Sequence, residues 1–365
     1  MKCALFHNFL DNIGGAEMVT LTLARELDAP IFTTNIDRNK IDAMGFSDVE
    51  VRSIGRVPIN APFRQQFALL RFLFFKDTEH RDCYVISGDW AMSGAFRNKP
   101  AIWYVHSPIR EVWDLADYIR TNLIPWYKRP LFDVFVIVNR ILNRWLVRHV
   151  ARCVCNSKNV QNRLKRFLKR DSAIVHPPIE TGRYRYRPAE GYWLSVNRLF
   201  HHKRIELQLE TFRSMPDKRL IIVGSYEKAH HFTEYAKRMQ DMAPSNVEFR
   251  SWVTDEELRE LYGGCIGFVT TARDEDFGMT VVEAMAAGKP VLAPNEGGYR
   301  ETVVDGQTGI LIDDIDADTL RTAIYELEKK AVNMRGACEE RARAFDSDIF
   351  TETMRKEIMQ CINSQ

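Results

Sequence analysis

Two glutamates flank a glycine turn in the second half of the chain. Glu275 belongs to an acidic loop, and Glu283 belongs to a helix expected over Thr280–Ala287. Between them, Gly278 permits a tight turn into that helix. The first backbone N–H groups of the helix, at Gly278–Thr280, lack partners within it and could hold an anion. Packing alone does not explain this spacing, so it predicts a site for a negatively charged ligand.

Two cations, Arg198 and Lys203, follow a strand expected over Tyr192–Val196. Ligands of α/β sheets bind at the carboxyl ends of the strands, and an arginine placed there can grip a diphosphate with two parallel hydrogen bonds. A solvated basic turn, extended by the neighbouring Arg204, explains the same residues equally well.

A pair of glycines, Gly14-Gly15, lies between a strand expected over Lys2–Phe6 and a helix expected over Ala16–Leu27. Because glycine has no Cβ atom, the backbone N–H groups of the pair can approach a ligand, and the helix start adds a partial positive charge suited to phosphate. A purely structural turn is the alternative. The pair does not form the G-x-G-x-x-G fingerprint of dinucleotide-binding proteins.

Short apolar strands and helices alternate along the chain in two blocks, which predicts two α/β domains with parallel sheets. The first domain is expected over residues 1–175, the second over residues 176–348, and a final helical segment over residues 349–365. The strands are expected at Lys2–Phe6, Ile31–Thr34, Val49–Val51, Cys83–Ser87, Ala101–Val105, Cys153–Cys155 and Ala173–Val175, and then at Tyr192–Val196, Arg219–Val223, Val247–Phe249, Ile266–Thr270, Pro290–Ala293 and Gly309–Ile312.

The composition is that of an ordinary globular protein. Of the 365 residues, 45% are hydrophobic and 27% are charged, which excludes disorder, collagen and coiled coil. The seven cysteines are scattered, and Cys153 and Cys155 are spaced for neither a zinc site nor a redox pair, so we expect no metal site. The first residues lack the features of a signal peptide, and polar residues interrupt the apolar stretch Leu131–Val147. We therefore expect a cytoplasmic protein without a membrane-spanning helix.

The net charge of +2 hides a difference between the two halves of the chain. Residues 1–175 carry 26 Lys and Arg against 17 Asp and Glu, so the first half is basic. Its stretches Pro62–Lys76 and Arg120–Arg170 interleave aromatic residues with cations, as segments that contact an anionic membrane surface do. In the alternative, Phe67, Leu70 and Phe74 face the core and the arginines are merely solvated. The motifs give no support for nucleic acid as the partner.

The segment from Glu275 to Glu283 resembles the E-x7-E motif of the retaining glycosyltransferases of family 4, which have the GT-B fold. Other segments are similar to motifs of this family and occur in the same order, over nearly the whole chain: Gly14–Glu17, Tyr104–Arg110, Asn156-Ser157, Arg198 with Lys203, and Gly297-Gly298 with Glu301-Thr302. The segment around His106 resembles the H-[ST]-P-x-R motif of bacterial and archaeal mannosyltransferase-like members. The resemblance implies two Rossmann-like domains whose parallel sheets face each other across a cleft, with the C-terminal helix crossing back to the N-terminal domain.

The resemblance also implies roles for individual residues. The first domain would bind the acceptor and the second a nucleotide-diphosphate sugar. Arg198 and Lys203 would neutralise the departing diphosphate, Glu275 and His106 would contact the donor sugar, and Glu283 would bind the ribose hydroxyls. The remaining donor contacts would come mainly from the backbone, at Gly14, Gly15, Phe277, Gly278, Met279 and Thr280 for the phosphates and at Trp252 and Val253 for the base. Neither a metal nor a cofactor besides the nucleotide sugar would be required.

We therefore expect a retaining hexosyltransferase that extends a lipid-linked or surface glycan. GDP-mannose is the first candidate donor and a UDP-sugar the next. A non-catalytic subunit that binds a sugar nucleotide, or serves as a scaffold on the same fold, is the alternative. The protein would be peripheral on the inner face of the cell membrane if its basic-aromatic stretches contact lipid.

Overall fold

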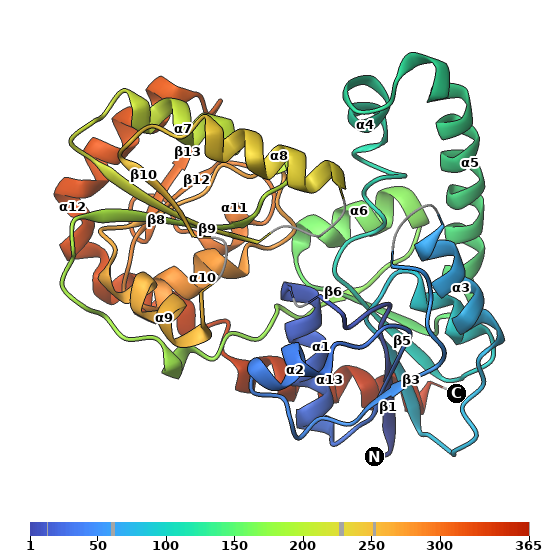
Figure 1. Ribbon diagram of the computed structural model, residues 1–365. Coiled ribbons are helices and arrows are strands. Elements are labelled where there is room, and N and C mark those ends of the chain that lie inside the picture. Colours follow the sequence, from blue (N-terminus) through green and yellow to red (C-terminus); the bar gives the residue numbers. More distant parts are fainter. Residues whose placement is uncertain (13, 60–62, 226–229, 251–252, 365) are drawn as a thin grey trace. The chain divides into compact units, whose positions relative to one another are not determined.

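The computed structural model describes residues 1–12, 14–59, 63–225, 230–250 and 253–364. It divides the chain into two units, Met1–His176 together with Thr351–Gln365, and Pro177–Phe350. Each unit is built on one parallel sheet with helices around it (Figure 1). Both units are Rossmann-like, as the alternation of strands and helices predicts.

The sheet of the first unit has seven strands in the order β3-β2-β1-β4-β5-β6-β7, and neighbouring strands run parallel. The strands are β1 (Cys3–Phe6), β2 (Ile31–Thr33), β3 (Val51–Ser53), β4 (Cys83–Ile86), β5 (Ala101–Val105), β6 (Arg152–Cys155) and β7 (Ala173–Ile174). Their β-branched and aromatic side chains are buried on both faces of the central strands, which is typical of a parallel sheet covered by helices.

The third strand begins later than its sequence indicates. It was expected at Val49–Val51, whereas the paired residues are Val51–Ser53. Val49 is buried, but its backbone N–H donates a hydrogen bond to the carbonyl of Phe46 in the preceding turn. The apolar run therefore starts inside that turn, before strand pairing begins.

Among the described residues of this unit, six helices connect these strands. They are α1 (Gly15–Leu27), α2 (Arg38–Ala43), α3 (Arg64–Phe74), α4 (Ala116–Asn122), α5 (Arg129–Leu146) and α6 (Lys158–Leu168). Short 3₁₀ turns lie at Ala91–Phe96, Trp126–Lys128 and Val147–His149. Ser157 caps α6, since its hydroxyl accepts a hydrogen bond from the backbone N–H of Val160 at 3.0 Å.

The second unit has a six-stranded parallel sheet in the order β10-β9-β8-β11-β12-β13. Its strands are β8 (Tyr192–Arg198), β9 (Arg219–Ser225), β10 (Val247–Arg250), β11 (Phe268–Val269), β12 (Val291–Pro294) and β13 (Gly309–Ile312). Its helices are α7 (Ile205–Arg213), α8 (His230–Asp241), α9 (Asp255–Gly264), α10 (Met279–Ala286), α11 (Tyr299–Thr302) and α12 (Ala317–Arg343), with 3₁₀ turns at Thr181–Arg183 and His201–Lys203.

The C-terminal helix α13 (Ser347–Asn363) starts in the second unit, and its residues from Thr351 onward belong to the first. Within the first unit, Arg152 of β6 forms an ion pair with Glu357, and Arg355 donates to the carbonyl of Glu26. Met354, Ile358 and Cys361 are buried there. The expected return of the C-terminal helix to the N-terminal domain is confirmed.

The cysteines belong to the cores of the two units. All seven are buried free thiols, and Cys153 and Cys155 lie on β6. Along the described part of the chain, no helix is both long enough and apolar enough to span a bilayer.

The helix α3 leaves several of its large apolar side chains exposed. Phe67, Leu70 and Phe74 are 46%, 45% and 66% exposed, so the alternative that placed them in the core is wrong. The core-facing residues of α3 are Ala68, Leu69 and Phe72. Arg64, one of the cations of this stretch, is not merely solvated. It is paired with Asp11 and lies over the ring of Phe9. Pro62 lies outside the described residues.

Candidate active site

In the second unit, the basic turn after β8, which contains Lys203, is hydrogen-bonded to the loop that precedes α10. The hydroxyl of Thr271 donates to the carbonyl oxygen of Lys203 at 2.7 Å, and the backbone N–H of Arg273 donates to the carbonyl of His202 at 2.8 Å. Because β8 and β11 are adjacent and parallel, their carboxyl ends lie at the same edge of the sheet. The two predicted motifs are thereby brought together.

A side-chain contact between these motifs joins Lys203 and Glu275. Nζ of Lys203 lies 2.6 Å from Oε2 of Glu275, and the two side chains are 14% and 20% exposed. The ion pair is neutral overall, but its lysine end can still attract an anion, because low exposure reduces screening by water. The residue pair that the sequence assigned to one ligand is therefore in contact.

The glycines Gly297 and Gly298 shape the acidic loop from the other side. Gly297 has a φ of +61°, and a Cβ atom on it would lie 2.5 Å from the carbonyl oxygen of Glu275. A Cβ atom on Gly298 would lie 2.5 Å from Cα of Phe277, and its backbone N–H donates to the carbonyl of Glu275 at 2.8 Å. Only glycine permits this close approach of two backbones.

The helix α10 begins at Met279, and Gly278 occupies the position before it with a φ of +91°. A Cβ atom on Gly278 would lie 2.7 Å from the ring of Tyr299, so both the backbone and the space require glycine. Thr280 and Met279 are half-buried in the first turn. The helix start is thus formed where the sequence predicted an anion-binding turn.

Glu283 lies one turn further along α10 and accepts a hydrogen bond from the hydroxyl of Tyr262 at 2.7 Å. Burial raises the pKa of Glu283 to about 7, the hydrogen bond from Tyr262 opposes this rise, and the nearby charge of Asp255 adds to it. The carboxyl group therefore changes its charge near neutral pH. Tyr262 was not singled out from the sequence, because a tyrosine on a helix has no distinguishing spacing.

The other residues predicted to bind the nucleotide sugar differ in how deeply they are buried. The side chain of Phe277 is 2% exposed and packs edge-to-face on Phe345 at 5.4 Å, so only its backbone can serve a ligand. Arg198 is exposed, and its guanidinium lies 5.4 Å from the ring centroid of Phe200. Val253 is partly buried against the core of the second unit, and Trp252 lies outside the described residues.

In the first unit, polar residues follow the ends of four adjacent strands. His7 follows β1, Ser87 follows β4, His106 follows β5 and Asn156 follows β6. Nε2 of His106 lies 2.7 Å from Oγ of Ser87, and Asn156 donates to the backbone carbonyl of His106 at 2.9 Å. The ring of His106 also meets Tyr104 edge-to-face at 5.1 Å. The imidazole of His106 is therefore fixed by its neighbours on the sheet edge.

The glycine loop before α1 is organised by Glu17. The backbone N–H of Gly14 donates to Oε2 of Glu17 at 2.8 Å, and the other carboxylate oxygen lies 3.2 Å from Nε2 of His7. The N–H of Gly14 is thus committed to the capping carboxylate in this conformation. The N–H of Gly15, the second glycine of the pair, opens the first turn of α1.

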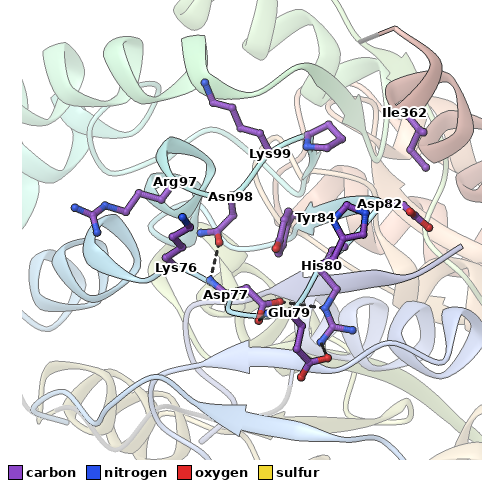
Figure 2. A pocket seen from close by; sticks show the side chains of 12 residues that line it. Lys76, Asp77, Glu79, His80, Asp82, Tyr84, Arg97, Asn98, Lys99 and Ile362 are labelled. Atoms are coloured by element: carbon purple, nitrogen blue, oxygen red, sulfur yellow. Dashed lines mark hydrogen bonds and ion pairs between the residues drawn. The ribbon is translucent and has the colours of Figure 1, made fainter.

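A charged hollow of about 500 Å³ lies elsewhere on the first unit (Figure 2). Its lining includes Asp82, which precedes β4, and Lys99, which comes shortly before β5, so it sits at the amino ends of these strands. Asp77 donates its backbone N–H to the side chain of Asn98 at 2.8 Å on its wall (Figure 2). His106 and Ser87 lie at the opposite, carboxyl ends. The hollow is therefore separate from the predicted site.

Among the described residues, no group of three or more His, Cys, Asp and Glu side chains is arranged to hold a metal ion. Asp274, Glu275 and Asp276 are consecutive in the sequence, and two of these residues contact protein groups. Glu275 pairs with Lys203, and the backbone N–H of Asp274 donates to Glu296 at 3.2 Å.

Two family models match the chain, one over each unit. The model described as Glycosyltransferase Family 4 matches residues 13–183, and the model described as Glycosyl transferases group 1 matches residues 185–345. Among characterised relatives, the alpha-1,3/1,6-mannosyltransferase ALG2 of Dictyostelium discoideum is 26% identical, over 85% of this chain and 86% of its own length.

Solved structures share the architecture over the full chain. HepE of Anabaena in complex with UDP and glucose has a TM-score of 0.78 at 18% identity, and covers 98% of this chain and 99% of its own. Sucrose-phosphate synthase from Thermosynechococcus elongatus also has a TM-score of 0.78, at 17% identity over the whole of both chains. At these identities the likeness shows the fold, and that fold is GT-B.

Proposed function

This chain belongs to the family 4 glycosyltransferases of the GT-B fold, and on that premise we propose that it transfers a hexose from a nucleotide-diphosphate sugar with retention of configuration. The observation that carries the proposal is the contact between Lys203 and Glu275. It joins the basic turn and the acidic motif in one place, as a site for a sugar diphosphate requires. The UDP and glucose bound by HepE support a nucleotide sugar as the co-substrate.

The diphosphate is the leaving group of such a reaction, and its negative charge grows as the glycosidic bond breaks. Lys203 and Arg198 would stabilise that charge, together with the backbone N–H groups of Gly15 and of the α10 start at Gly278, Met279 and Thr280. Fixed donors aimed at developing charge usually supply the largest catalytic contribution. The two cations would do the work that a divalent metal does in other transferases, and activity should therefore persist in excess chelator.

Retention requires the acceptor to attack from the face that the diphosphate leaves. We propose that the departing phosphate oxygen takes the acceptor proton, so that neither glutamate acts as a nucleophile as in retaining hydrolases. Glu275 would hold donor-sugar hydroxyls while paired with Lys203, Glu283 would bind the ribose hydroxyls, and His106 would contact the sugar. Val253 and its neighbours would meet the base through their backbone.

Mannose is the sugar that we propose, with GDP-mannose ahead of a UDP-sugar. Support comes from the relatives named alpha-1,3/1,6-mannosyltransferase and from the segment Tyr104–Arg110. As the acceptor we propose a glycan, either lipid-linked or at the cell surface. Thermal-shift measurements with GDP, UDP, ADP and their sugars test the donor directly, because the nucleotide that belongs to the site should raise the melting temperature most.

A non-catalytic sugar-nucleotide-binding or scaffold subunit on the same fold remains the competing function. It would bind nucleotides through Glu283 and the α10 start without needing Lys203. Release of nucleotide diphosphate from the donor separates the two functions, because a binding subunit releases none.

We further propose that the first unit docks on an anionic membrane through the outer side of α5, here called the α5 face. This face consists of Leu131, Val134, Ile137, Val138, Ile141 and Trp145. Leu131 and Ile141 are 73% and 64% exposed, whereas Asn139 and Asn143 are buried on the inner side. Asn139 donates to the carbonyl of Phe135, and Asn143 accepts from the indole of Trp113 at 3.2 Å. Unlike an ordinary surface helix, α5 thus buries two asparagines while it exposes six apolar side chains.

The apolar surface continues from the α5 face to α3. Phe96 packs against Trp145 at 5.7 Å between ring centroids, and the next residue, Arg97, lies over the ring of Phe74 at 5.9 Å. The two basic-aromatic stretches of the sequence therefore contribute to one surface. An exposed apolar area of this extent is typical of an interaction site.

The chemistry around the α5 face favours a bilayer as its occupant. Trp126 and Tyr127, 78% and 63% exposed, precede the helix, and exposed Lys128 and Arg148 lie near its two ends. Residues 120–170 carry 13 basic residues against one acid, a charge complementary to anionic lipid. Exposed aliphatic side chains framed by tryptophan, tyrosine and cations match a helix lying in a membrane interface. A lipid-linked acceptor would be met at the same surface.

A further inference from the structure

A chain of hydrogen-bonding side chains links Glu17 to His106 inside the first unit, and we call it the Glu17–His106 relay. Its members are Glu17, His7, Thr20, Ser87 and His106. At the first end, Oε1 of Glu17 lies 3.2 Å from Nε2 of His7, and Nδ1 of His7 lies 3.2 Å from Oγ1 of Thr20. Oγ1 of Thr20 then lies 2.6 Å from Oγ of Ser87, which lies 2.7 Å from Nε2 of His106.

The sheet order of the first unit creates the relay. His7, Ser87 and His106 each come directly after one of the neighbouring strands β1, β4 and β5, while Glu17 and Thr20 lie one turn apart on α1. His7, Thr20 and Ser87 are 3%, 1% and 3% exposed, so water does not compete for their hydrogen bonds. In such an environment each proton position depends on the next.

The proton of Thr20 sets the direction of the relay. Its hydroxyl can donate to the carbonyl of Ala16 at 2.8 Å, to Nδ1 of His7, or to Oγ of Ser87. In the first two cases Ser87 must donate to Thr20, and Ser87 then accepts the Nε2 proton of His106. Only in the third case is the proton of Ser87 directed at His106.

Glu17 favours the first two cases. A carboxylate beside Nε2 of His7 accepts the proton on that nitrogen, which leaves Nδ1 of a neutral His7 as an acceptor for Thr20. If His7 is instead fully protonated, its Nδ1 donates to Thr20, and the carbonyl of Ala16 can accept the Thr20 proton. In both of these arrangements the hydroxyl of Thr20 remains an acceptor for Ser87.

We propose that Thr20 and Ser87 are positioning residues that hold the imidazole of His106 with its proton on Nε2 and its ring directed at Ser87. The proposal rests on the proposed function, in which His106 contacts the donor sugar. A histidine whose tautomer and orientation are fixed before the donor arrives loses less freedom in the transition state. Neither Thr20 nor Ser87 needs to touch the substrate.

A merely structural role for these buried hydroxyls, as satisfied polar groups in the core, predicts a different outcome. Their removal would then change stability without changing the proton position on His106. Thr20→Val keeps the shape of the side chain and removes the hydroxyl, whereas Thr20→Ser keeps the hydroxyl. This pair of variants separates packing from proton placement.

The test is long-range ¹H–¹⁵N NMR of the full-length protein with labelled histidine, in which the His106 signals are assigned by their loss in His106→Gln. The parent and Thr20→Ser should show the Nε2–H tautomer. Thr20→Val should shift His106 toward the Nδ1–H tautomer, because the proton of Ser87 then points at Nε2. Ser87→Ala provides a second variant and should lose the preference for Nε2–H.

Kinetics provide the second measurement. Thr20→Val and Ser87→Ala should each lower kcat on the order of tenfold with the donor KM within about twofold of the parent, and Thr20→Ser should retain the parent kcat. A His106 tautomer that is unchanged in both Thr20→Val and Ser87→Ala would overturn the relay. Parent-like activity of His106→Gln would instead remove the proposed role of His106, and the NMR result would still report on the relay.

Discussion

Nζ of Lys203 lies 2.6 Å from Oε2 of Glu275, although the two residues are 72 positions apart in the sequence. The pair gives the lysine a fixed position at the carboxyl edge of the sheet before any ligand is bound. A diphosphate that approaches Lys203 meets a cation already held in place, so little side-chain freedom remains to be lost on binding. The same contact holds the carboxylate of Glu275 beside the lysine.

Replacing either cation should therefore remove most turnover while the fold survives. Lys203→Ala and Arg198→Ala should each raise the barrier by about 2–4 kcal/mol, since each loses a charge contact to the leaving group. Steady-state kinetics measure the loss, and the melting temperature checks the fold. Lys330→Ala is the matched control, because Lys330 forms a similar 2.7 Å ion pair with Glu326 on exposed α12. Parent-like rates in Lys203→Ala would remove the diphosphate assignment.

The raised pKa of Glu283 predicts two pH dependences of opposite sign. Because the folded-state pKa of about 7 exceeds the ordinary value of 4.5, the folded protein binds this proton more tightly than the unfolded chain does. The stability contributed by Glu283 should be fully present below about pH 4.5 and lost as the pH rises through about 7. The affinity for the nucleotide-sugar donor should rise as the pH rises through about 7, because the ionised carboxylate accepts hydrogen bonds from the ribose hydroxyls.

Chemical denaturation and calorimetric titration between pH 5 and 8 measure both effects. Glu283→Gln keeps an acceptor for Tyr262 and cannot ionise, so its affinity for the nucleotide should be lower and nearly independent of pH in this range. An equally steep pH dependence in Glu283→Gln would assign the titration to another group.

Gly297 should be far less tolerant of a side chain than another glycine in a similar backbone conformation. Gly297 and Gly306 have φ values of +61° and +72°, but a Cβ atom on Gly297 would meet the Glu275 backbone at 2.5 Å, whereas nothing lies within 4 Å of the same position on Gly306. Gly306→Ala should cost about 1–2 kcal/mol from backbone strain alone. Gly297→Ala should cost more and also weaken donor binding, because it displaces the loop carrying Glu275. Equal melting temperatures for the two variants would contradict this role of the close approach.

Binding to vesicles should depend on both charge and the α5 face. The parent should sediment with vesicles that contain phosphatidylglycerol and not with pure phosphatidylcholine, and added salt should weaken the binding, since each cation near an anionic surface contributes about 1 kcal/mol. The double variant Leu131→Gln/Ile141→Gln should bind several-fold more weakly at constant charge. Val332→Gln is the control, because Val332 is a 78% exposed valine on α12 in the second unit.

Donor affinity should remain unchanged in all of these surface variants. Unaltered sedimentation of Leu131→Gln/Ile141→Gln would exclude insertion of the α5 face into lipid. A concentration-dependent dimer of the parent that the same double variant abolishes would assign the face to a protein contact instead.

The sequence predicted the parallel sheets, and the family resemblance assigned Lys203 and Glu275 to one donor, but their direct contact was not predicted. Buried β-branched runs mark parallel strands, and the carboxyl ends of adjacent parallel strands share one edge, so residues that follow β8 and β11 lie at the same edge. The glycines at 278 and 297 were also informative, because only backbones with positive φ or close neighbours require them.

Two other features could not be predicted from the sequence, and the cause is physical in each case. The orientation of α5 depends on what its inner side meets, and Asn139 and Asn143 find partners there that the sequence pattern does not reveal. The Glu17–His106 relay combines threonine, serine and histidine residues of ordinary type, whose meaning depends on which strands are neighbours. A usable signal existed in the positions of His7 and Ser87 directly after buried strands.

The measurement that tests the central claim most directly is the release of nucleotide diphosphate by the parent and by Lys203→Ala. The donors are GDP-mannose, UDP-glucose and ADP-glucose. The acceptor is a polyprenyl-diphosphate glycan, and excess chelator is present. The parent should release GDP from GDP-mannose in step with mannose transfer, and the new bond should retain the configuration of the donor. Lys203→Ala should be slower by a factor of about 30 to 1000, as a barrier increase of 2–4 kcal/mol requires. Tight binding of a nucleotide sugar by the parent without release of its diphosphate would contradict the enzyme and support a binding subunit.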